Sequence, residues 1–144
     1  MPRLISQQTE TALCILVELA LLPGGEPVQA GELSRRSGIP TASAHQALVR
    51  LRRQGFVHSE RGPLGGYSLA RDAAELPVGE VVAAFEGAGS VARGATEEPS
   101  KRAVRQWILA TERELDALLA SETVGGLAKR ARWLSEAMAL MPGL

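Results

Sequence analysis

The residues best placed to do chemistry are the polar and basic ones on a predicted helix from Thr41 to Arg53. Alanine or leucine recurs three and four residues apart, so one side of this helix is expected to pack inward: Ala44, Ala47, Leu48 and Leu51. The opposite side and its flanks carry Ala42, His45, Gln46, Val49, Arg50, Arg52 and Arg53. A helix that is apolar on one side and small, polar and cationic on the other fits the major groove of DNA.

The residues just before this helix are expected to position it. A short helix is predicted from Ala30 to Ser37, and it ends at Gly38 because glycine adopts the left-handed conformation at little cost. Pro40 cannot extend that helix, and Thr41 is a good N-cap for the next one. The pattern predicts a helix-turn-helix.

A β-hairpin is predicted directly after it. Strand-like runs from Phe56 to Arg61 and from Tyr67 to Arg71 flank the loop GPLGG, whose glycines allow the chain to reverse. A hairpin behind a recognition helix is the wing of a winged helix. We expect Arg61, at the shoulder of this loop, to enter the adjacent minor groove.

Three blocks of the sequence resemble the Rrf-two family of bacterial regulators: VQAGELSRRSGIP, ALVRLRRQGFVHSERGPLGGYSLAR and LPVGEVVAAFEG. The wing followed by a Pro-Val-Gly-Glu-Val-Val helix is the most specific part, and the resemblance extends to about Gly126. It implies a mainly α winged helix-turn-helix with a small β-hairpin wing and a long dimerisation helix. Many members carry Glu at the position of His45, so the base preference of this chain is expected to differ.

The first predicted helix runs from Gln7 to Leu22, with Ser6 as N-cap, and is apolar nearly all round, so it should lie at the centre of the fold. In the family its start contacts DNA phosphate and is usually basic. Here it has the sequence SQQTET, without Lys or Arg. Ser6 and Gln8 are still expected to hydrogen-bond a phosphate near the helix N-terminus.

The chain has no net charge, but its charges are unevenly distributed. From Ala30 to Arg71 there are seven arginines against Glu32 and Glu60, a net charge of +5, whereas the residues from Asp72 onward carry −3. Such a concentration of positive charge is typical of phosphate binding. A solvated charged face is the alternative.

A flexible loop is expected from residue 88 to residue 99, since this stretch is small, polar and rich in glycine. Family members that bind an iron–sulfur cluster place three cysteines there, and this chain has none in the loop. Its single cysteine, Cys14, cannot supply the several thiolates that a cluster needs. We therefore predict a member without cluster, metal or other cofactor.

A long helix is predicted from Ser100 to Ser121, and its apolar residues repeat at spacings of four and three. The family places dimer contacts on this seam, so we expect dimerisation through Val104, Trp107, Ile108, Leu115 and Leu118. Packing on the chain's own domain is the alternative. Thr123 to Gly126 is expected to break the helix, and a final helix is expected from Leu127 to Leu140. Trp133 in that helix and Met141 just after it could equally well pack in the core or against a partner subunit.

These elements predict a winged helix-turn-helix domain with its linker helix (1–87), the loop (88–99) and dimerisation helices (100–144). The Met-Pro-Arg-Leu-Ile-Ser start shows no signal peptide, and the apolar run from Thr11 to Leu22 is short and contains Glu18. A cytoplasmic protein without a membrane partner is expected.

The predicted function is a homodimeric, sequence-specific DNA-binding transcription regulator, a repressor that binds a palindromic operator. Base contacts are expected from Thr41, His45, Gln46 and Arg61, and phosphate contacts from Ser6, Gln8, Arg50, Arg52 and Arg53. A small-molecule effector, a partner protein or oxidation of Cys14 would switch it. The alternative is an interaction scaffold that does not bind DNA. An enzyme finds little support, because neither His45 nor His58 has a catalytic or metal-binding neighbour at suitable spacing.

Overall fold

Helix α1 (Gln7–Leu21) lies at the centre of the molecule, as its all-round apolar sequence predicted. The computed structural model describes residues 4–87, 98–141 and 143. Four residues of α1 are buried in the core: Ala12, Ile15, Leu16 and Leu19. The later elements, in chain order, are η1 (Pro23–Gly25), α2 (Ala30–Ser37), α3 (Thr41–Arg53), β1 (Val57–Glu60), β2 (Gly66–Leu69), η2 (Ala73–Glu75), α4 (Val78–Glu86), α5 (Pro99–Ser121) and α6 (Val124–Ala139).

Two of the predicted caps are found in the structure and one is not. The hydroxyl of Ser6 accepts a hydrogen bond from the Thr9 amide at 3.2 Å, and Gly38 ends α2 with a φ of 72°. The prediction that Thr41 caps α3 is wrong. Pro40, with extended backbone, takes the N-cap position, and Thr41 is the first helical residue, with its hydroxyl 3.2 Å from the hydroxyl of Ser34.

The hairpin is tied to the body along β2. β1 and β2 pair antiparallel, from Val57 opposite Leu69 to Glu60 opposite Gly66, and are shorter than predicted. Val28 exchanges two backbone hydrogen bonds of 2.8 Å with Tyr67, so it forms a third pairing partner beside β2. A Cβ on Gly66 would overlap the Val28 carbonyl, so this close approach requires glycine.

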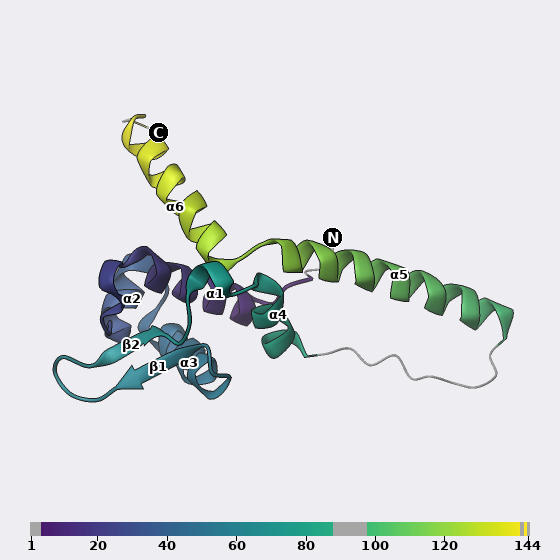
Figure 1. Cartoon of the computed structure of the whole chain (residues 1–144), viewed down its shortest axis with the longest axis horizontal. Coiled ribbons are helices and arrows are strands. Elements are labelled where there is room, and N and C mark those ends of the chain that lie inside the picture. Colours follow the sequence, from purple (N-terminus) through teal and green to yellow (C-terminus); the bar gives the residue numbers. More distant parts are fainter. Residues whose placement is uncertain (1–3, 88–97, 142, 144) are drawn as a thin grey trace.

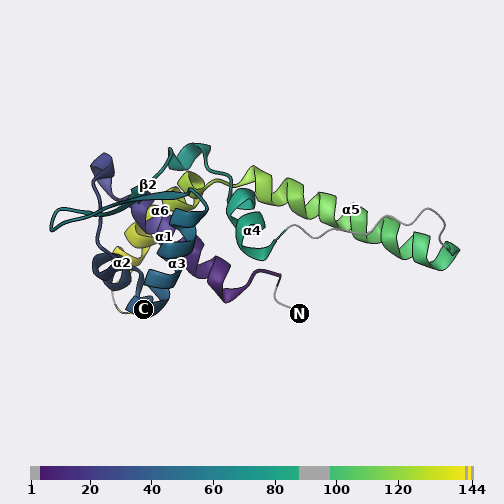
Figure 2. The same ribbon diagram turned by 90° about the horizontal axis from the view of Figure 1, so that it is seen from below.

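Helices α5 and α6 project from the body in different directions (Figure 1). No residue of the 23-residue α5 is buried, and only its last turns reach α4, where Leu119 lies against Gly79. Seen from below, α3 and the hairpin face the viewer while α5 extends to one side (Figure 2). The described part of the chain is mainly helical with one two-stranded hairpin, which confirms the predicted fold class.

The joint between α5 and α6 consists of Glu122 and Thr123 and is fixed to the start of α4. The Val78 amide donates to the Glu122 carbonyl at 2.9 Å, and the Val124 amide donates to the Leu76 carbonyl at 2.9 Å. These bonds form a short antiparallel bridge, so the joint is held by the body on both sides.

The final helix starts earlier than predicted. Thr123 caps it by accepting from the Gly126 amide at 3.0 Å, so Gly125 and Gly126 lie in its first turn and do not break it. A Cβ on Gly125 would overlap the backbone of Ala74, which explains a glycine there.

The division into residues 1–87, 88–99 and 100–144 stays a prediction, and the expected loop lies outside the described residues at positions 88–97. Val124 belongs to the same core cluster as α1, so the first turns of α6 are part of the body and only its outer half projects. None of the helices in the described part is long and apolar enough to cross a membrane.

Replacing Gly66 with alanine should loosen the hairpin, because the new Cβ needs the space of the Val28 carbonyl. We expect a loss of roughly 2 kcal/mol in unfolding free energy, measured by urea denaturation. Gly31→Ala in α2 is the control, since nothing lies near its Cβ; it should stabilise the fold by about 0.5–1 kcal/mol. Equal effects of both substitutions would contradict the close approach.

Candidate nucleic-acid interface

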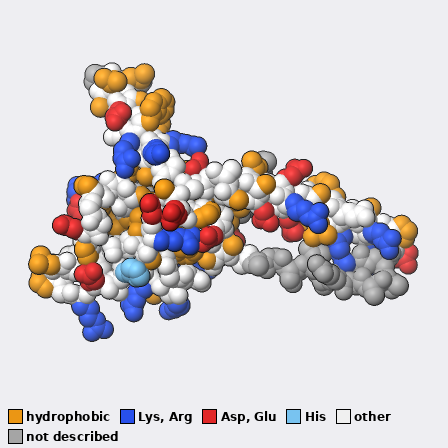
Figure 3. Space-filling view, viewed as in Figure 1, with side chains coloured by type: hydrophobic (Ala, Val, Ile, Leu, Met, Phe, Trp, Pro, Cys, Tyr) orange, Lys and Arg blue, Asp and Glu red, His pale blue; other side chains and the backbone are white. Residues whose placement is uncertain are grey.

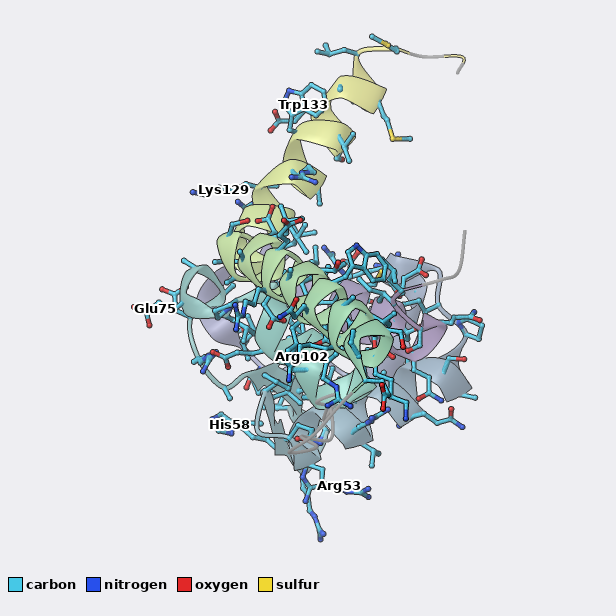
Figure 4. All side chains as sticks on the ribbon, turned by 90° about the vertical axis from the view of Figure 1, so that its right-hand side faces the viewer. Arg53, His58, Glu75, Arg102, Lys129 and Trp133 are labelled. Carbon is cyan, nitrogen blue, oxygen red and sulfur yellow. The ribbon has the colours of Figure 1, made fainter. Side chains whose placement is uncertain are left out.

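The outward side of α3 is exposed and the opposite side is buried, as the sequence predicted. Ala44, Ala47, Leu48 and Leu51 pack into the core. The exposed residues are Thr41, Ala42, Ser43, His45, Gln46, Val49, Arg52 and Arg53. Arg53 projects away from the body at the lower end of the molecule (Figure 4). This helix therefore offers a surface with little apolar area to a partner.

Ion pairs divide six of the seven arginines of residues 30–71 into two groups. Three are paired with a carboxylate: Arg35 with Glu32 at 2.6 Å, Arg36 with Glu18 at 3.1 Å and Arg71 with Glu80 at 2.5 Å. Within the described ranges, no carboxylate lies within 4.0 Å of Arg52, Arg53 or Arg61. Lys and Arg side chains project from the lower edge of the body (Figure 3). Unpaired cations on an exposed face are the groups available to bind phosphate.

Arg50 is half-buried and lies against neighbouring elements rather than projecting from the helix. Its Nη1 donates to Oε1 of Gln8 at 3.0 Å and its Nη2 donates to the Phe85 carbonyl at 2.8 Å. The guanidinium also lies 4.3 Å from the centre of the Phe85 ring, within the range of a cation–π contact. Arg50 thus connects α3 to the start of α1 and the end of α4.

A carboxylate occupies the N-terminus of α1, where a phosphate contact was predicted. Oε1 of Glu86 accepts from the Ser6 amide at 2.7 Å and from the Thr9 hydroxyl at 2.6 Å. Ser6 therefore points its amide at a negative charge from the protein itself. Sequence reasoning missed Glu86, because a contact across 80 residues leaves no local pattern.

The hydrogen bond from the Thr9 side chain, followed by those from Ser6, lowers the pKa of the Glu86 carboxyl to about 2. The positive charge of Arg50 contributes in the same direction. Glu86 is accordingly ionised at neutral pH and links α4 to α1.

A cavity of about 270 Å³ lies between α1, α3 and the end of α4. It brings together three of the predicted site residues, Gln8, Gln46 and Arg50, whereas Ser6 is not among its lining residues. Its other walls are Gln7, Thr11, Ser43, Ala47 and Phe85. The cavity thus adjoins the exposed side of the recognition helix.

The tip of the wing is braced by hydrogen bonds. The Gly65 amide donates to the Gly62 carbonyl at 3.0 Å, and the side-chain amide of Gln29 donates to the Pro63 carbonyl at 3.4 Å. Arg61 is exposed beside this turn, and Leu64 at the tip is 91% exposed. The wing therefore holds Arg61 at a defined place relative to the body.

The remaining reactive side chains are isolated. His45 and His58 are both exposed, and no group of three or more potential metal ligands lies together in residues 4–87 and 98–141. Cys14 is exposed on α1, and partial burial, together with Glu10 and Glu18, raises the pKa of its thiol. A raised pKa disfavours the reactive thiolate.

Residues 5–130 match the sequence model of the Rrf2 (Rrf-two) family, which is described as iron-dependent transcriptional regulators. The chain belongs to this family. The Rrf2 regulator IscR of Escherichia coli is 40% identical over 75 residues, which make up 52% of this chain and 46% of the relative. IscR of Cronobacter sakazakii matches equally well. The chain thus spans about half the length of these curated relatives.

Solved structures resemble it over a greater length. CymR, the global cysteine regulator of B. subtilis, is 29% identical with a TM-score of 0.70, over 90% of this chain and 98% of that one. IscR of T. potens is 25% identical with a TM-score of 0.71, over 91% and 90%. The winged-helix fold is therefore shared with both.

The donor set of this Rrf2 chain does not fit the thiolate-ligated iron–sulfur cluster of some family members. Such a cluster needs several cysteine ligands, and the sequence contains only Cys14. That residue lies on the central helix α1, on the side away from the core. We assign no role to iron here.

The stabilising effect of Glu86 should depend on pH. Its pKa is about 2 in the folded chain, below the ordinary 4.5, so the stabilisation is complete above about pH 4.5 and is lost as the pH falls toward 2. Glu86→Gln should lower the melting temperature at pH 7, and the two proteins should converge near pH 2. Glu136→Gln, on the outer half of α6, is the control. A constant difference between pH 7 and pH 2 would contradict the assignment.

Proposed function

We propose that the chain is a homodimeric, sequence-specific DNA-binding transcription regulator that acts as a repressor where its operator overlaps a promoter. One observation carries this proposal: Arg52 and Arg53 on the exposed side of α3, and Arg61 on the braced wing, are exposed and have no carboxylate partner among the described residues. The membership in a family of transcriptional regulators supports it.

Base recognition is assigned to the exposed polar residues of α3 and the wing. Thr41, His45 and Gln46 would face base edges in the major groove, where an amide such as that of Gln46 can make paired hydrogen bonds with adenine. Arg61 would enter the minor groove, whose negative potential attracts arginine. Each good base contact discriminates by about 1–3 kcal/mol.

Phosphate binding is assigned to Arg52 and Arg53, with Gln8 as a neutral donor. The side-chain oxygen of Gln8 accepts from Arg50, which leaves its NH₂ group to donate to a phosphate. Ser6 and Arg50 have a different part in this proposal. Their contacts with Glu86, Gln8 and Phe85 hold α1 and α3 in register beneath the binding surface.

The dimer is assigned to α5. Its apolar seam is solvent-exposed in a single chain: Trp107 is 68% exposed and Leu118 is 70% exposed. Val104, Ile108 and Leu115 continue the seam at spacings of four and three. A 23-residue helix without a buried residue gains little from its own chain, so a second copy crossing it would supply the missing packing.

Arg53→Ala should weaken binding to all DNA sequences alike, because a phosphate contact carries no sequence information. The slope of log affinity against log salt concentration should fall by about 1, measured by fluorescence anisotropy. Lys129→Ala is the matched control, since it removes one charge from α6, away from Arg53 (Figure 4). An unchanged slope in Arg53→Ala would contradict the phosphate contact.

Arg61→Ala should reduce specificity. Binding to a duplex selected from a random library should lose about 1–3 kcal/mol, and binding to unselected DNA should lose less. Equal losses on both would refute the base contact. No binding to any duplex by the wild-type protein, even at low salt, would favour the interaction scaffold over a DNA-binding regulator.

Trp107→Glu should shift the protein toward the monomer, because it places a charge on the apolar seam. Sedimentation velocity at micromolar concentration should show the loss of the dimer. Gln106→Glu adds the same charge on the opposite side of α5 and should leave the dimer intact. A monomeric wild-type protein, or loss of the dimer in both variants, would contradict this interface.

A further inference from the structure

The cavity between α1, α3 and α4 has a lining that selects for negative charge. Arg50 provides a guanidinium on one wall, and its two hydrogen bonds to Gln8 and Phe85 use only two of its five N–H donors. Among the described residues that line the cavity, none carries a carboxylate. Glu86 lies nearby, but the Ser6 amide and the Thr9 hydroxyl hold its Oε1.

The rest of the lining suits an organic molecule better than a bare ion. Ala47 and Phe85 are buried core residues and supply apolar surface. Hydroxyl and amide groups of Thr11, Ser43 and Gln46 stand around them. The volume of about 270 Å³ is near the lower end of small-molecule sites. A DNA phosphodiester has no apolar body to place against the alanine and the phenylalanine.

We infer that this cavity binds a small organic carboxylate, with the acid group on Arg50 and the apolar body against Phe85 and Ala47. Gln46 forms part of the cavity wall and is also a proposed base contact, so a bound carboxylate and DNA compete for the same side chain. This consequence depends on the proposed DNA binding, whereas binding of the carboxylate itself does not. The protein would then release its operator when the acid accumulates, and the two affinities would be linked reciprocally.

Calorimetric titration of the full chain tests the site, with benzoate, its neutral analogue benzamide and inorganic phosphate as probes at constant ionic strength. Benzoate should bind at least tenfold more tightly than benzamide, and phosphate should bind more weakly than benzoate. Inorganic phosphate binding as tightly as benzoate would identify a DNA-backbone subsite only and overturn the inference. Absence of benzoate binding would also overturn it.

Two variants separate the site from general effects on folding. Arg50→Gln should bring the affinity for benzoate down to that for benzamide while benzamide binding is kept. Ser43→Leu should fill the cavity and abolish binding of both, whereas Ala42→Leu, the neighbouring exposed residue outside the lining, should bind like the wild type. Wild-type affinity in Ser43→Leu would show that benzoate binds elsewhere.

A competition measurement tests the link to DNA. Benzoate at ten times its dissociation constant should weaken binding to the selected duplex about tenfold, relative to sodium chloride at the same ionic strength. Unchanged DNA affinity with benzoate bound would overturn the link. Failure of the protein to bind any DNA would contradict the proposed function but not the carboxylate site, because calorimetry measures benzoate binding without DNA.

Discussion

The need to cover helix α1 on nearly every side determines the arrangement of the body. A helix with apolar residues around most of its circumference is stable only when other elements surround it. α2, α3, α4, the hairpin and the first turns of α6 meet this requirement. Because α3 turns Ala44, Ala47, Leu48 and Leu51 into the core, Arg52, Arg53 and the polar residues of its other side face outward. The exposed surface proposed to bind DNA is thus a consequence of core packing.

Local signals in the sequence predicted the elements well. Gly38 ends one helix and the three-and-four spacing of Ala44, Ala47, Leu48 and Leu51 sets the inward side of the next, since both effects act within a few residues. Thr41 and the start of α6 were predicted less well. Pro40, with extended backbone, takes the cap position expected of Thr41, and Thr123 caps α6 so that Gly125 and Gly126 fall in its first turn rather than before it.

The composition of the site could be predicted only in part. The sequence alone does not distinguish one arginine of a cluster from another. Arg50 hydrogen-bonds to Phe85, 35 residues away along the chain, and to Gln8, 42 residues away. These two contacts separate Arg50 from the exposed arginines Arg52 and Arg53. Glu86, at the end of α4, likewise binds the start of α1 across 80 residues of sequence, and no local pattern predicts that contact. Sequence reasoning can find a basic face; which of its charges are already satisfied depends on long-range neighbours.

The two-residue joint at Glu122 and Thr123 fixes the direction in which α5 leaves the body, because it is hydrogen-bonded to the start of α4. In a proposed assembly with two-fold symmetry built on α5, that direction also sets how far apart the two copies of α3 lie. In that proposed assembly, the distance between operator half-sites would be set at a position that is not among the proposed DNA or dimer contacts. Relatives could thus acquire a different operator length through this joint while keeping every base-contacting side chain.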